Sequence, residues 1–141
     1  MKVLLVTSSV PFPAKNGYTI VVYNTIKGLL DQGAEITVFS VNARKYSVDV
    51  RLLTDPLLDK INLITAPINT DINIKKAFLS LFTKKSYTIF RFYQSSSVSK
   101  LKNILQHSEF DIIQLEGLVV LPYLDVIRQN STAKIIYSSH N

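Results

Sequence analysis

The 141-residue chain has no cysteine, no tryptophan and only two histidines. Without cysteine it cannot form disulfides, thiolate-ligated zinc or iron–sulfur centres, or a catalytic thiolate. No apolar run approaches the roughly 20 residues that a membrane-spanning helix needs. With 47% hydrophobic and 18% charged residues, the composition is that of a folded chain. We expect one soluble domain over residues 1–141, because this length is too short for two ordinary cores.

The first residues lack the pattern of a secretory leader. Met1 to Thr7 carry one lysine and a very short apolar stretch, which is too little for a signal peptide. We therefore expect a cytoplasmic protein.

The net charge of +6 is concentrated in the middle of the chain. Residues 71–110 hold seven basic and two acidic side chains, and residues 72–108 contain no Asp or Glu. Aromatic residues alternate with these cations, a mixture typical of surfaces that bind single-stranded nucleic acid or an anionic membrane. Buried aromatics with solvated lysines would give the same pattern. The candidate anion-binding patch consists of Lys75, Lys76, Lys84, Lys85 and Arg91.

Apolar runs and helical stripes alternate along the chain. Strands are predicted at residues 2–8, 35–41, 61–65, 111–115 and 134–137. Helices are predicted at 18–32, around 74–82, around 98–105 after serines 95–97, and at 122–129, with a short helix within 44–59. Gly33 follows the first of them, at the place where a glycine often closes a helix. The order predicts an α/β fold with a Rossmann-like, doubly wound parallel sheet whose first strand is central.

In such sheets ligands bind beyond the carboxyl ends of the strands, so the segments 12–17, 116–117 and 138–141 should meet at one edge. Gly17 starts a helix, and the free N–H groups there favour an anion such as a diphosphate. A plain strand-to-helix turn is the alternative, since a loop with two prolines and a glycine that permits a positive φ would form one in any case.

Two further side chains at this edge are candidates for chemistry. Glu116 can accept hydrogen bonds from sugar hydroxyls, or it can be an ordinary solvated loop acid. His140 can transfer a proton near neutral pH, or it can be a surface histidine. His107, at the end of a predicted helix, fits a polar group near the helix carbonyls.

The order of these motifs resembles the N-terminal part of glycosyltransferase family 4, the retaining sugar transferases of the two-domain GT-B architecture. The matching segments are residues 1–7, the Pro-Phe-Pro-Ala-Lys-Asn-Gly loop at 11–17, Tyr23-Asn24, Phe110-Asp-Ile-Ile-Gln-Leu-Glu116 and Ser139-His140-Asn141. They span the whole chain. The resemblance implies that residues 1–141 are the acceptor-side domain, truncated before the C-terminal domain that binds the nucleotide sugar.

The resemblance also implies an activity and its residues. A sugar would pass from a nucleotide-diphosphate sugar to an acceptor hydroxyl with retention, without a metal or other cofactor, in polysaccharide or glycolipid synthesis. The implied roles are catalysis for His140, donor diphosphate contact for Asn16, Gly17 and Tyr18, and the acceptor cleft for Phe12, Glu116 and Asn141. The basic segment would hold a glycan or lipid-linked acceptor, or contact the inner face of an anionic membrane, with no nucleic-acid partner. Where many relatives have a second glycine and an arginine, this chain has Tyr18 and Val21.

Two other functions remain open from the sequence. One is a non-catalytic module of the same fold that binds anionic lipid or nucleic acid through residues 72–108. The other, ranked last, is a small nucleotide-binding hydrolase or receiver-like domain, which would need a phosphate loop and an acidic cluster that the sequence lacks.

Overall fold

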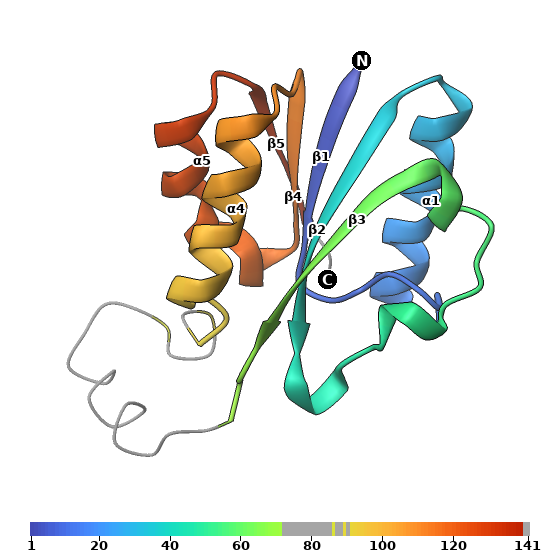
Figure 1. Cartoon of the computed structure of the whole chain (residues 1–141), viewed down its shortest axis with the longest axis horizontal. Coiled ribbons are helices and arrows are strands. Elements are labelled where there is room, and N and C mark those ends of the chain that lie inside the picture. The colour runs from blue at the N-terminus through green and yellow to red at the C-terminus, as the bar shows by residue number, and fades with distance from the viewer. Residues whose placement is uncertain (72–85, 87–88, 90, 140–141) are drawn as a thin grey trace.

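The computed structural model describes residues 1–71, 86, 89 and 91–139. These residues form a five-stranded, all-parallel sheet in the order β3-β2-β1-β4-β5, with helices on both faces (Figure 1). The strands are β1 (Lys2–Thr7), β2 (Glu35–Ala43), β3 (Ile61–Ile68), β4 (Ile112–Glu116) and β5 (Lys134–Ser138). The predicted α/β, Rossmann-like fold is confirmed.

The central strand β1 separates two buried clusters of side chains. Val3 and Leu5 belong to the cluster on the α1 face, and Leu4 and Val6 to the cluster beneath α4 and α5. All four are at most 1% exposed, so the continuous Val and Leu run is explained by burial on both faces. The prediction of a central first strand is confirmed.

The helix α1 (Gly17–Asp31) covers one face of the sheet. A capping box begins it: the Asn16 side chain accepts a hydrogen bond from the Thr19 N–H, and Thr19 Oγ1 accepts one from the Asn16 N–H, both at 3.0 Å. At the other end Gly33 adopts a φ of 76° and donates its N–H to the Leu30 carbonyl at 2.9 Å. This left-handed residue closes the helix, as the sequence indicated.

The opposite face carries α4 (Ser95–His107) and α5 (Leu124–Asn130). Two predicted starts were wrong. Serines 95–97 form the first turn of α4 instead of preceding it, because the chain already turns at Gln94, whose N–H bonds to Ser97 Oγ at 3.4 Å. The predicted helix at 122–129 is preceded by the 3₁₀ helix η4 (Leu118–Tyr123), since Gly117, with a φ of 84°, turns the chain directly after β4.

The remaining described elements are short. The segment predicted to contain one short helix holds three 3₁₀ turns: η1 (Arg44–Tyr46), η2 (Val50–Leu52) and η3 (Leu58–Lys60). The helix predicted around residues 74–82 lies outside the described residues. Among the described helices, none combines the length and apolarity needed to cross a membrane.

Gly33 and Gly28 provide a matched test of this account of α1. Gly33→Ala should lower the free energy of unfolding by about 1–2 kcal/mol, because an L-residue in the left-handed region is strained. Gly28→Ala should raise it by about 0.5–1 kcal/mol, since that glycine lies inside the helix and an added Cβ meets no atom within 4 Å. Urea unfolding measures both. Equal effects of the two variants would contradict the assigned helix end.

Candidate functional site

A pocket of about 340 Å³ lies at the carboxyl edge of the sheet. In Figure 1 this edge is marked by the arrowheads of β2 and β3. Its lining residues follow three neighbouring strands and precede α4, with one from η4: Ser8, Ser9, Asn42, Ala43, Lys45, Tyr46, Thr70, Asp71, Arg91, Phe92 and Val119. The pocket borders the point between β1 and β4 where the strand order reverses, which is where open α/β sheets bind ligands.

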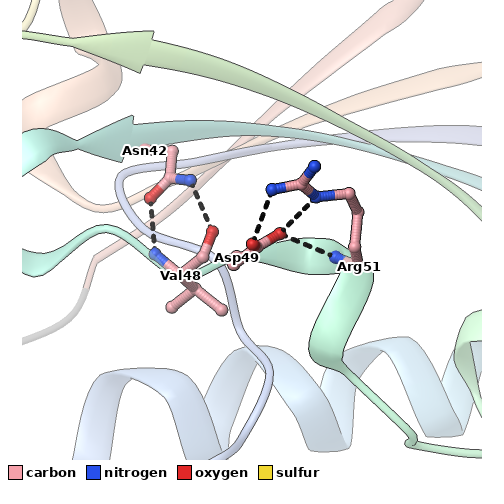
Figure 2. A network of polar contacts seen from close by, with 4 residues as sticks. All are labelled: Asn42, Val48, Asp49 and Arg51. Carbon is pink, nitrogen blue, oxygen red and sulfur yellow. Dashed lines mark hydrogen bonds and ion pairs between the residues drawn. The ribbon is translucent and has the colours of Figure 1, made fainter.

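One wall of the pocket is a loop closed by a single asparagine. The Asn42 side chain donates to the Val48 carbonyl at 2.9 Å and accepts from the Val48 N–H at 3.0 Å (Figure 2). These bonds tie the end of β2 to a residue beyond η1, so Lys45 and Tyr46 are held at the pocket. Because both its amide oxygen and its amide nitrogen bond to Val48, Asn42 shapes this wall.

A neighbouring cation is already paired. Arg51 bonds to the Asp49 carboxylate through Nε at 2.9 Å and Nη2 at 2.8 Å, and its backbone N–H adds a third bond at 3.1 Å (Figure 2). The hydrogen bonds from the Arg51 side chain are the main reason that the pKa of Asp49 is lowered. Arg51 does not line the pocket.

The opposite wall depends on Tyr123. This fully buried side chain donates its hydroxyl to the Phe92 carbonyl at 2.7 Å and lies 2.6 Å from Ser97 Oγ. Its ring packs edge-on against Phe39 and Tyr93. Burial raises the pKa of Tyr123 to about 12. The bond to Phe92 fixes the backbone next to Arg91, whose guanidinium lies 5.4 Å from the Phe92 ring.

Arg91 is half-buried, and its Nε atom is buried without a hydrogen-bond partner. Within the part of the chain that the structure describes, the ion pairs are Lys2 with Glu35 and Arg51 with Asp49, so no described carboxylate neutralises Arg91. It is the one member of the predicted basic patch that lies among the described residues. Lys75, Lys76, Lys84 and Lys85 lie outside them.

Tyr18 joins the first loop to the end of β4. Its hydroxyl accepts a hydrogen bond from the Ser8 N–H at 2.9 Å and donates to the Glu116 carbonyl at 3.2 Å. Burial is the main cause of the raised pKa of this phenol. The Gly117 N–H then bonds to the Ser138 carbonyl at 2.9 Å. The loop after β1 and the ends of β4 and β5 therefore lie at one edge, as expected from the order of the elements.

A row of polar side chains crosses the whole sheet beneath these loops. The strand registers align the residues Thr65, Ser40, Thr7, Glu116 and Ser138 on adjacent strands. They lie on the α1 face, because Val3 and Leu5 of that face alternate with Leu4 and Val6. Glu116 accepts a hydrogen bond from the Gln114 side chain at 2.5 Å. Sequence reasoning missed this row, since it exists only once the registers are known.

Gly17 is the first residue of α1 and is exposed. An added Cβ would meet no atom within 4 Å, and its φ is not positive. The turn into the helix does not use the positive φ that a glycine permits, and the Asn16 capping box closes it. Asn16 uses its side chain for this cap.

Two residues assigned to the acceptor cleft are buried. Phe12 is 0% exposed and packs edge-on against Tyr23, with ring centroids 5.6 Å apart. The loop folds its ring into the α1-face cluster, so Phe12 is a core residue here, and its role in an acceptor cleft stays a prediction. Glu116 is also 0% exposed, which excludes a solvated loop acid. His140 and Asn141 lie outside the described residues.

The amino edge of the sheet also has hollows, lined among others by Lys2, His107 and Glu109. His107 Nδ1 lies 2.8 Å from the Asn103 carbonyl, which confirms its reading as a polar group near helix carbonyls. Among the described residues, no three metal-ligating side chains lie together. The expectation of a metal-free site stays a prediction.

No family model matches the chain, and neither curated proteins nor solved structures match it. The fold is therefore established by the structure itself, and the resemblance to glycosyltransferase family 4 stays a prediction.

The bridge made by Tyr18 can be tested by removing one oxygen. Tyr18→Phe leaves the Ser8 N–H and the Glu116 carbonyl without this partner, so the free energy of unfolding should fall by about 1–2 kcal/mol. Tyr46→Phe, at a residue 73% exposed, is the matched control and should change it by less than about 0.5 kcal/mol. Urea unfolding checks both, and equal losses would argue against the bridge.

The raised pKa of Tyr123 predicts a loss of stability in alkali. In the unfolded chain the phenol ionises near pH 10.0, whereas in the folded chain it stays neutral until about pH 12. Its contribution is thus complete below pH 10.0 and is lost as the pH rises towards 12, by up to about 1.4 kcal/mol per pH unit. Urea unfolding at about pH 9 and about pH 11 should show a smaller fall for Tyr123→Phe than for the parent chain. An identical fall would contradict the buried assignment.

Proposed function

We propose that the chain is the acceptor-side domain of a retaining GT-B glycosyltransferase similar to family 4. It would take part in transferring a sugar from a nucleotide-diphosphate sugar to an acceptor hydroxyl. The observation that carries the proposal is the Tyr18 bridge: segments that are far apart in the sequence, and that carry the resemblance, meet at the carboxyl edge beside a pocket.

The exposed start of α1 supports contact with the donor. The first N–H groups of a helix lack partners within the helix, and the positive end of its dipole favours an anion. Asn16 satisfies the Thr19 N–H, while the space before the Gly17 Cα is open. A diphosphate could therefore approach the backbone at Gly17 more closely than any side chain would allow.

The carboxyl-edge pocket, whose lining residue Ser8 is bonded to Tyr18 of α1, supports an acceptor site. Its volume of about 340 Å³ falls within the range of small-molecule sites, about 300–1,000 Å³. Its polar lining includes Ser8, Ser9 and Thr70, whose hydroxyls can exchange hydrogen bonds with an acceptor. In the same proposal, His140 acts near the reacting sugar, and the nucleotide is held by the second Rossmann-like domain of the GT-B architecture. The protein would work in the cytoplasm against the inner face of the membrane.

The alternative of a module that binds anions through residues 72–108 has weaker support. Arg91, the one described member of that patch, lines a pocket and is half-buried instead of standing on an open surface. Such a placement favours a small ligand over a broad membrane or nucleic-acid face.

Gly17→Val in the complete gene product tests the proposal. A branched side chain at this position should obstruct the diphosphate and reduce kcat/KM for the nucleotide sugar by about tenfold or more. Folding should be preserved because the added Cβ meets no neighbour, and thermal unfolding checks this.

Nucleotide release from a panel of UDP-, GDP- and ADP-sugars gives the rate, with Gly28→Ala as the control that should keep full turnover. No release from any donor, or full turnover in Gly17→Val, would refute the assignment.

A further inference from the structure

Arg91 lines the carboxyl-edge pocket, and one of its hydrogen-bond donors has no partner. Arg91 presents a buried Nε atom without a hydrogen-bond partner. A buried donor of a charged group that makes no hydrogen bond costs folding free energy, so native structures nearly always supply a partner for it. Because the Nε atom itself is shielded from solvent, a ligand in the pocket would meet the other atoms of Arg91, which line the pocket.

The other charged residues of the pocket leave it with a net positive lining. Lys45 also lines it, with its ammonium 5.4 Å from the Tyr46 ring, and no described carboxylate pairs with it. Asp71 is the acidic residue of the lining, and it is exposed. Two cations against one carboxylate favour an anion over a cation or a neutral ligand.

The shape of the donors narrows the class of anion. A guanidinium matches phosphate and carboxylate oxygens with a fork of N–H groups, and the hydroxyls of Ser8, Ser9 and Thr70 can complete the shell of such a group. Arg51 illustrates the preference, since it holds the Asp49 carboxylate by Nε and Nη2.

We infer that this pocket binds a phosphate or carboxylate group through Arg91 and Lys45. The next step rests on the proposed function. If the pocket is the acceptor site, the acceptor is an anionic sugar or a lipid-linked sugar phosphate, which is held by its charge while its hydroxyl faces the donor. Tyr123 is a positioning residue here, because its bond to the Phe92 carbonyl fixes the backbone beside Arg91.

Titration with inorganic phosphate, glucose 6-phosphate, glucuronate and uncharged glucose tests the inference, read by the ¹⁵N-resolved signal of the Arg91 Nε–H group. The anions should shift this signal and glucose should not. Arg91→Gln should weaken anion binding by at least about tenfold, because one charge-assisted hydrogen-bond fork is lost. Arg51→Gln, at a paired cation outside the pocket, is the matched control and should change it by less than about twofold.

A variant of Asp71 should change the affinity for anions in the opposite direction. Asp71→Asn removes the carboxylate of the pocket lining and should tighten anion binding by about two- to fivefold at low salt. Weaker binding in this variant would mean that Asp71 itself holds the ligand, and the inference would fall.

A vesicle-binding experiment distinguishes an anion that belongs to a lipid headgroup from a free sugar phosphate. Sedimentation with phosphatidylglycerol vesicles, lost in Arg91→Gln and kept in Arg51→Gln, would assign the group to a lipid headgroup. Binding of glucose 6-phosphate with no vesicle binding would assign it to a free sugar phosphate. Equal binding of glucose and glucose 6-phosphate, no shift of the Arg91 Nε–H signal, or equal loss in the two arginine variants would overturn the inference.

These outcomes are independent of the test of the proposed function. Anion binding in a protein that turns over no nucleotide sugar would remove the acceptor role and leave the anion site. Turnover with neutral acceptors only would keep the transferase function and remove the anionic acceptor.

Discussion

The position of β1 between β2 and β4 is the constraint on which the rest of the molecule depends. Both neighbours pair with β1 in parallel along almost its whole length, so β1 and β4 end level at Thr7 and Glu116, and β2 continues past the same level to Ala43. Every loop that could carry chemistry then leaves the sheet at the same edge. Leu4 and Val6 belong to one hydrophobic cluster and Leu5 to the other, and all three are fully buried. Displacing β1 would therefore open both clusters at once.

Two tyrosines hold the loops at that edge from opposite faces of the sheet. Tyr18, on the α1 side, ties the Ser8 N–H to the Glu116 carbonyl. Tyr123, on the side of α4, ties the Phe92 carbonyl to the start of that helix through Ser97. Burial raises the pKa of both phenols, and the hydrogen bonds of each hydroxyl offset the cost of that burial. The pocket at this edge is thus supported by the hydroxyls of two residues outside its lining, and Arg91 in that lining makes no ion pair with a described carboxylate.

Local sequence signals predicted the elements well where one dominant force acts. The Val and Leu run of β1, the apolar stripe of α1 and the closing Gly33 were all identified, because burial and backbone geometry leave a mark on neighbouring residues. The burial of Phe12 and Glu116 was not predicted. Phe12 lies in the loop after β1 and Glu116 is the last residue of β4, positions that favour a cleft residue, yet both side chains are buried.

The sequence by itself determined the alternation of strands and helices, and with it a parallel sheet whose ligand edge is known in advance, since hydrophobic periodicity is a local property. Only the tertiary structure decided which charged groups are paired. Arg51 pairs with Asp49, two residues away, whereas Arg91 lines a pocket and makes no ion pair with a described carboxylate. The strand registers, which are long-range pairings, likewise created the polar row through Thr7 and Glu116.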